Sequence, residues 1–193
     1  AVQLCLDSNI AIINGGPGTG KTTTIKSLVA SITPQAESQG KIVRILGVAP
    51  SGLAAERMTA ATGVRATTVH NALNARINEG FGKNSNNQIE VDVLLLDEVG
   101  NLDAQTFQAL LRATPNGARI YMSGDVDQLA SVSPGFILSD LMNSERVPTA
   151  HLTEVGRQAK GSLIPIVSEQ INTGVVPDLA AHTDDWGFIP GGS

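Results

Sequence analysis

The sequence predicts an α/β fold, in which helices cover both faces of a mainly parallel sheet. Three observations support this prediction. Strand-like and helix-like segments alternate along the chain, which is typical of a parallel sheet. The most strongly apolar segment is continuous rather than alternating, as expected for a strand buried on both faces. Hydrophobic residues make up 41% of the chain but aromatic residues only 3%, so Ile, Leu, Val and Ala must fill the core.

Length and charge restrict the classes of function. A chain of 193 residues is long enough to bury a substantial single core, so we expect one domain with extensions. The net charge of −5 has the wrong sign for a protein that overall charge holds on nucleic acid. Any nucleic-acid contact must therefore be a local groove of backbone N–H groups, hydroxyls and a few cations.

The sequence predicts a reduced, cytoplasmic protein with no membrane partner. Its single cysteine, Cys5, cannot form an internal disulfide and is expected in the core. No apolar run approaches the length of a membrane span, and no signal-peptide pattern is visible in the sequence. The chain begins inside a helix-like segment over residues 1–6 and ends in a flexible Gly-Gly-Ser, so we expect a fragment of a longer protein.

The first strong motif is GGPGTGKT over residues 15–22, which matches the phosphate-binding loop pattern G-x-x-x-x-G-K-[ST]. An apolar run at 10–13 precedes it as a predicted strand, and a predicted helix over 22–30 follows. Such a loop places backbone N–H groups and a helix N-terminus around phosphates. Lys21 is expected to reach the β- and γ-phosphates, and the Thr22 hydroxyl to bind Mg²⁺. The alternative is a glycine-rich turn without a ligand.

Eight residues would bind the nucleotide in this interpretation. They are Gly16, Pro17, Gly18, Thr19, Gly20, Lys21, Thr22 and Thr23.

After this helix the sequence predicts further alternating elements. In chain order they are a polar linker over 33–40, a strand over 41–49, a helix over 53–61 ended by Gly63, an extended piece over 66–70 and a helix over 71–77. The turn-rich stretch 79–90 follows, and it fits either a small exposed hairpin or a disordered surface loop.

The second strong motif is VDVLLLDE over residues 91–98. Its apolar run predicts a buried central strand, which ends in two carboxylates at the edge of the sheet where open α/β folds bind ligands. Asp97 suits the support of Mg²⁺. Glu98 suits a general base that orients or deprotonates an attacking water.

The last part of the chain continues the alternation. The expected elements are a helix over 104–113, a strand over 118–123, a loop over 131–135, a helix over 136–142, a strand over 149–153 and a helix over 162–171. Gln128 follows one of these strands, and its amide could sense a γ-phosphate. The alternative there is a turn with a capping Asp.

This arrangement is the P-loop NTPase architecture, and five segments make the resemblance more specific. In chain order they are GGPGTGKTTT, APSGLAAERMTAATGVRATTVH, VDVLLLDE, YMSGDVDQLASVSPG and LTEVGRQAKGSLI. They resemble the motifs of RecD-like DNA helicases of superfamily 1, whose relatives include the helicase portions of TraA-type conjugation proteins. The resemblance covers residues 2–174. It implies a first RecA-like motor domain over 1–174, with 79–90 as a small hairpin insertion that acts as a strand-separating pin.

The resemblance also implies roles for individual residues. Lys21, Glu98, Gln128 and Arg157 would be catalytic, with Gln128 linking the γ-phosphate to the DNA groove and Arg157 contacting that phosphate. Thr22 and Asp97 would hold the metal. The residues that would line a single-strand groove are Pro50, Ser51, Gly52, Thr67, Thr68, His70, Ser131 and Val132.

The sequence therefore favours an ATP- and Mg²⁺-dependent DNA helicase fragment that moves 5′ to 3′ on single-stranded DNA. Residues 175–193 would be an extension or the start of a linker to a second RecA-like domain. Other subunits of a DNA-processing complex are further expected partners. A P-loop ATPase that does not move on DNA and a nucleotide-dependent interaction module remain alternatives. Repair as an exodeoxyribonuclease V α subunit, conjugation and phage replication all fit the motor.

Overall fold

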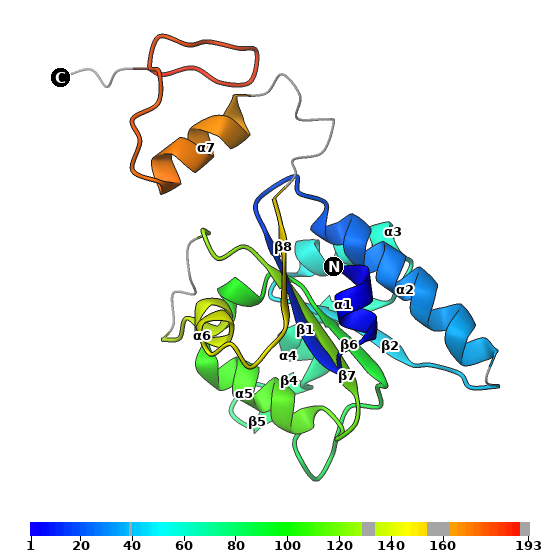
Figure 1. Cartoon of the computed structure of the whole chain (residues 1–193). Coiled ribbons are helices and arrows are strands. Elements are labelled where there is room, and N and C mark those ends of the chain that lie inside the picture. The colour runs from blue at the N-terminus through cyan, green and yellow to red at the C-terminus, as the bar shows by residue number, and fades with distance from the viewer. Residues whose placement is uncertain (39, 129–133, 154–162, 190–193) are drawn as a thin grey trace.

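The computed structural model describes residues 1–38, 40–128, 134–153 and 163–189 (Figure 1). Six strands form its main sheet in the order β3-β2-β6-β7-β1-β8, and every neighbouring pair is parallel. The strands are β1 Ile10–Gly15, β2 Ile45–Ala49, β3 Ala66–Thr68, β6 Val93–Leu96, β7 Arg119–Gly124 and β8 Thr149–Leu152. The predicted parallel α/β fold is confirmed.

Helices pack on both faces of this sheet. One face carries α1 Val2–Leu6, α2 Lys21–Glu37 and α3 Gly52–Thr62. The other carries α4 Val69–Ala72, the 3₁₀ helix η1 Val99–Asn101, α5 Ala104–Ala113 and α6 Ile137–Asn143. Helix α7 Ile164–Asn172 lies apart from these layers in Figure 1. Among the described residues, no helix has the length and apolar character needed to cross a bilayer.

The central strand β6 shows why its sequence is continuously apolar. Leu94 and Leu96 enter the core beneath α4, α5 and α6, while Val93 and Leu95 enter the core beneath α1, α2 and α3. All four side chains are buried. Because alternate residues of a strand face opposite sides, a strand covered on both sides must be apolar at every position.

Helix α2 corrects the prediction of a polar linker over 33–40, because the helix continues to Glu37. Its buried face runs from Ile25 and Leu28 to Ile32 and Ala36, which recur at helical spacing. Pro34 lies inside the helix on its exposed side. We infer that burial of the apolar stripe outweighs the backbone hydrogen bond that proline removes.

The predicted helix over 71–77 is also wrong, because α4 ends at Ala72. Asn74 and Asn78 have φ values of 51° and 67°, in the left-handed region that a helix cannot contain. The chain instead forms a two-stranded antiparallel ribbon of β4 Ala75–Arg76 and β5 Gly80–Phe81. This ribbon begins before the turn-rich stretch 79–90 and ends inside it.

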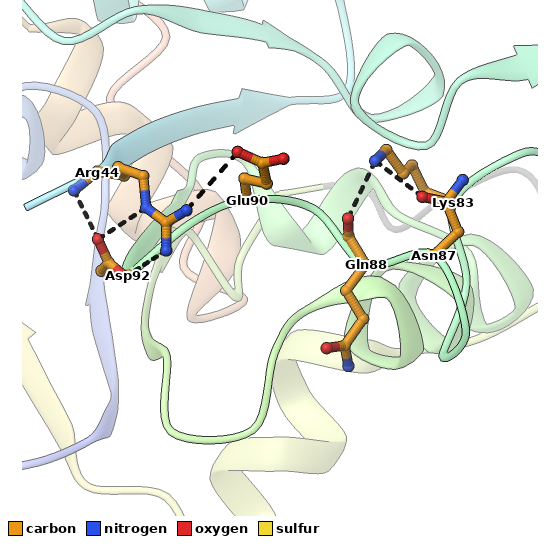
Figure 2. Close-up of polar contacts among 6 residues, drawn as sticks. All are labelled: Arg44, Lys83, Asn87, Gln88, Glu90 and Asp92. Carbon is orange, nitrogen blue, oxygen red and sulfur yellow. Dashed lines mark hydrogen bonds and ion pairs between the residues drawn. The ribbon is translucent and has the colours of Figure 1, made fainter.

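The return from the ribbon to the sheet is held by polar contacts (Figure 2). Lys83 Nζ donates to Asn87 Oδ1 at 3.2 Å and to the Gln88 carbonyl at 3.0 Å. The backbones of Asn84 and Asn87 exchange two hydrogen bonds of 3.1 Å, which close the turn. This part of the 79–90 stretch is thus a hydrogen-bonded turn.

Arg44 joins the start of β2 to the residue that precedes β6. Its guanidinium donates to both carboxylate oxygens of Asp92, at 3.1 and 2.9 Å, and its backbone N–H donates at 2.8 Å. Glu90 lies 3.7 Å from the same guanidinium (Figure 2). Strand β2 begins at Ile45 rather than at residue 41 as predicted, directly after this ion pair.

The substitution Asp92→Asn should lower the melting temperature slightly at neutral pH. Hydrogen bonds from Arg44 hold the pKa of the Asp92 carboxyl below its usual range. A depressed folded-state pKa stabilises the fold above the unfolded-state pKa of about 3.9, and the contribution is lost as the pH falls through the folded value. Thermal unfolding followed by circular dichroism should show a larger difference from wild type at about pH 7 than at about pH 3.

The exposed Asp184 provides the matched control, since Asp184→Asn removes a carboxylate that forms no ion pair with a described residue. It should leave the melting temperature unchanged at both pH values. An equal loss for Asp92→Asn at both pH values would show that the ion pair contributes nothing.

Candidate nucleotide-binding site

The loop between β1 and α2 requires glycine at several positions. Gly18 and Gly20 have φ values of 73° and 88°, which residues with a Cβ rarely adopt. At Gly15 the restriction is space. A Cβ there would lie 2.6 Å from Thr19 Oγ1 and 2.8 Å from the Leu152 carbonyl oxygen on β8. The glycines therefore let the backbone turn tightly at the end of β1.

Helix α2 starts directly after this loop, at Lys21. The first N–H groups of a helix have no acceptor within it, and no side chain caps this one. The N-terminus of this 17-residue helix also contributes a partial positive charge. The loop and helix start together form a site suited to phosphate oxygens.

Lys21 lies over the loop. Its ammonium donates to the carbonyl oxygens of Gly15 and Gly16, the latter at 2.9 Å. Burial lowers the pKa of the Lys21 ammonium, while the carboxylates of Asp125, Asp97 and Glu98 act in the opposite direction. The lysine is therefore a partly desolvated cation next to three acids.

A cleft of about 210 Å³ opens at this edge of the sheet. Its walls come from the start of α2, from α3 and from the carboxyl ends of β6 and β7. The charged or polar residues that line it include Lys21, Thr22, Arg57, Asp97, Glu98, Asp125 and Gln128. The structure thus brings together all the predicted catalytic and metal-binding residues that it describes.

Asp97 is positioned by the neighbouring strand. Leu96 pairs with Met122 in the sheet, which places Asp97 beside Ser123. The Ser123 hydroxyl, on a fully buried residue, donates to Asp97 Oδ1 at 2.6 Å, and the Glu98 N–H donates to the same oxygen at 3.0 Å. The Oδ2 atom accepts no hydrogen bond from a described residue, which leaves it available to a cation.

Glu98 has a strained backbone. Its φ and ψ of 52° and 43° lie in the left-handed region, which costs a residue with a side chain roughly 1–2 kcal/mol. Such strain is concentrated at functional sites, where the surrounding structure holds it. Here η1 begins directly after Glu98 and packs its buried Val99 into the core.

Gln128 is held by a turn after β7. Its side-chain amide donates to Asp125 Oδ2 at 3.1 Å, and Asp125 Oδ1 accepts from the Asp127 N–H at 3.1 Å. Asn14 on β1 accepts from the Val126 N–H at 3.1 Å, which ties the turn to the phosphate loop strand. The capped turn that was the alternative interpretation is therefore present, and it also places Gln128 in the cleft.

The described residues contain no cluster of three or more His, Cys, Asp or Glu that could hold a metal ion by themselves. Mg²⁺ does not require one, because it commonly uses one or two carboxylates together with substrate phosphates. The Thr22 hydroxyl and the Asp97 carboxylate line the same cleft and fit this kind of site.

A second cleft, of about 420 Å³, lies between α3 and the end of β3. Gly52, Thr67 and Thr68 line it, as predicted for the single-strand groove, and so does the carboxylate residue Glu56. Among the described residues, no Lys or Arg lines this cleft.

Two of the predicted groove hydroxyls also cap helices. Ser51 Oγ accepts from the Ala54 N–H at the start of α3, and Thr68 Oγ1 accepts from the Asn71 N–H at the start of α4, both at 3.2 Å. Each cap stabilises the fold by roughly 1 kcal/mol whatever else its hydroxyl contacts.

Other predicted residues lie outside these clefts. Pro50 precedes α3 without lining the groove, and exposed His70 has its ring 6.3 Å from that of Phe81 on the ribbon. Arg157, Ser131 and Val132 lie outside the described residues.

The roles of Ser123, Asn14 and Arg57 were not predicted from the sequence. Ser123 and Asn14 are the penultimate residues of apolar strands, so the signal that indicated Asp97, a polar residue close to the end of such a strand, is present there too. Arg57 gave no such signal, because one cation on a helix surface is common.

A protein-family model described as an AAA domain matches residues 1–193. The chain belongs to this family.

The AAA domain is also similar to curated helicase proteins. It is 32% identical to the RecBCD enzyme subunit RecD of Mycobacterium tuberculosis over 90% of its length, which is 34% of that protein. It is 40% identical to the ATP-dependent RecD2 DNA helicase of Deinococcus radiodurans over 78% of its length, which is 20% of that protein. The resemblance to RecD-like helicases is confirmed, and the chain spans about a third or a fifth of the length of these relatives.

Among solved structures, the AAA domain resembles the Pif1 helicase from Candida albicans. The TM-score is 0.64 at 20% identity, over 92% of this chain and 43% of that one. At this identity the likeness concerns the fold, and it agrees with a P-loop, RecA-like architecture.

The strain at Glu98 has a measurable consequence. Glu98→Gly and Glu98→Ala both remove the carboxylate, but only glycine adopts the left-handed backbone without cost. Glu98→Gly should therefore exceed Glu98→Ala in stability by about 1 kcal/mol, measured as the free energy of unfolding in urea. Equal stabilities would show that the backbone relaxes and stores no strain.

Proposed function

We propose that this chain is the first RecA-like motor domain of an ATP-dependent DNA helicase. The observation that supports it best is the cleft that joins the phosphate loop to Asp97, Glu98 and Gln128. The relatives named as RecD and RecD2 support the helicase reading of that cleft. Single-stranded DNA is the proposed substrate, and 5′ to 3′ is the proposed direction.

The residues of the cleft have distinct chemical tasks in this proposal. The loop N–H groups and Lys21 bind the phosphates, and the residues that would hold Mg²⁺ are Thr22 and Asp97. When bound, Mg²⁺ supplies positive charge that offsets the phosphate oxygens. Ser123 keeps Asp97 in place through the 2.6 Å hydrogen bond.

Glu98 and Gln128 act on the reacting end of the nucleotide. The Glu98 carboxylate orients a water molecule for in-line attack and accepts its proton. Gln128, fixed through Asp125, contacts the γ-phosphate with its amide. Arg157 is proposed to offset charge on the same phosphate.

We further propose that residues 1–174 form the motor domain and that 175–193 lead towards a second RecA-like domain. That domain would supply the opposite wall of the ATP site, since phosphoryl transfer needs cations from both sides. The proposed setting is the cytoplasm, with other subunits of a DNA-processing complex as partners. Repair, conjugation and phage replication each remain consistent with it.

One observation favours an ATPase that does not move on DNA. The described residues that line the groove along α3 include Glu56 but no Lys or Arg, which is unfavourable for a phosphate backbone. If the chain is a helicase, attraction of the DNA strand by the hydroxyls and backbone N–H groups of the groove must outweigh its repulsion by the Glu56 carboxylate.

The test is the ATPase rate of the full-length protein with and without single-stranded DNA. We expect DNA to raise the rate, because the motor couples hydrolysis to movement. Glu98→Gln should keep nucleotide affinity and lower turnover by at least about a hundredfold. A DNA-independent rate would refute the helicase reading, and normal turnover in Glu98→Gln would remove the residue from the role of base.

The groove gives a second prediction. Glu56→Gln should raise the affinity for single-stranded DNA by roughly twofold to fivefold, because it removes one repulsive charge near the strand. Fluorescence anisotropy of a labelled oligonucleotide measures this affinity. Glu37→Gln, at the exposed end of α2, is the control and should have no effect. Unchanged binding in Glu56→Gln would place the strand elsewhere.

A further inference from the structure

Helix α3 presents two faces to two different clefts. Ala54, Arg57 and Met58 line the nucleotide cleft. The groove is lined instead by Gly52, Ala55, Glu56, Thr59 and Ala60. At 100° per residue these two sets lie on opposite sides of the helix. Arg57 therefore belongs to the nucleotide side of α3.

The charge of Arg57 is not neutralised by a described partner. The ion pairs among the described residues join Arg44 to Glu90 and Asp92, and Arg76 to Glu79. Arg57 is exposed and forms neither an ion pair nor a side-chain hydrogen bond with a described residue. A guanidinium stays protonated at any physiological pH, so this cation remains available to an anion.

The topology places Arg57 across the cleft from Lys21. Lys21 follows β1, Arg57 follows β2, and β6 and β7 lie between these strands in the sheet. The ends of β6 and β7 carry Asp97, Glu98 and Asp125. Two cations thus flank the carboxylates at the place where the terminal phosphate of a bound nucleotide would lie.

We propose that Arg57 binds the γ-phosphate of the nucleotide and makes this site prefer triphosphate to diphosphate. This inference rests on the proposed function, since it names a further contact in the same cleft. A guanidinium can bind two phosphate oxygens at once, whereas the Lys21 ammonium acts as a point charge. A contact to the last phosphate alone is lost in the diphosphate.

A phosphate of the DNA strand has the same chemistry as a nucleotide phosphate. The helix geometry favours the nucleotide, because the groove lies on the opposite face of α3. The experiment therefore measures the two affinities separately.

The experiment compares Arg57→Ala with wild type in the full-length protein, using fluorescent analogues of ATP and ADP and a labelled oligonucleotide. We expect the affinity for the ATP analogue to fall about tenfold, as for loss of a charged hydrogen bond. The affinities for the ADP analogue and the oligonucleotide should stay within about twofold of wild type. Arg57→Lys should recover part of the loss, because it keeps the charge without the two-pronged geometry.

Two further variants separate this inference from the proposed function. Arg112→Ala, on the exposed side of α5, is the matched control and should change nothing. Lys21→Ala should abolish binding of both nucleotides, and normal binding in that variant would overturn the proposed function itself. If Lys21→Ala behaves as expected, then equal changes in the two affinities for Arg57→Ala would overturn the role of Arg57 alone. A loss confined to the oligonucleotide would also overturn it and assign Arg57 to the strand.

Discussion

Burial of both faces of the sheet is the constraint on which the site depends. Strand β6 places apolar side chains into two separate cores, so a polar residue has no position within the strand. Asp97 is the first residue after β6, the strand that is covered on both faces. Near the ends of β1 and β7, the penultimate residues Asn14 and Ser123 form hydrogen bonds with Val126 and Asp97. The polar side chains that line the nucleotide cleft therefore lie at or beyond the carboxyl ends of the buried strands.

The parts of the site predicted from sequence are those encoded within one short segment. Residues 15–22 and the pair Asp97 and Glu98 each combine a pattern with a local strand, so neither needs knowledge of the rest of the fold. Ser123 and Arg57 could not be assigned in this way. The position of Ser123 depends on the register of β6 against β7, and that of Arg57 on the packing of α3.

The errors in the fold have the same origin. The segment 33–40 looks like a linker by composition, but burial of Ile32 and Ala36 against the sheet extends the helix. The segment 71–77 looks helical by composition, but Asn74 adopts a left-handed backbone. In the first case tertiary packing overrode the local propensity. In the second case the left-handed backbone of Asn74 is incompatible with a continued helix. The roles of Arg157, Ser131 and Val132 stay predictions.

The close approach of Leu152 to Gly15 bears on the mechanics of the loop. These residues pair in the sheet, and the Leu152 carbonyl oxygen occupies the space that a Cβ on Gly15 would need. The backbone of the phosphate loop and the backbone of the last residue of β8 are therefore in direct contact. A displacement of the end of β8 would therefore be transmitted to the phosphate loop through backbone atoms, with no side chain between them.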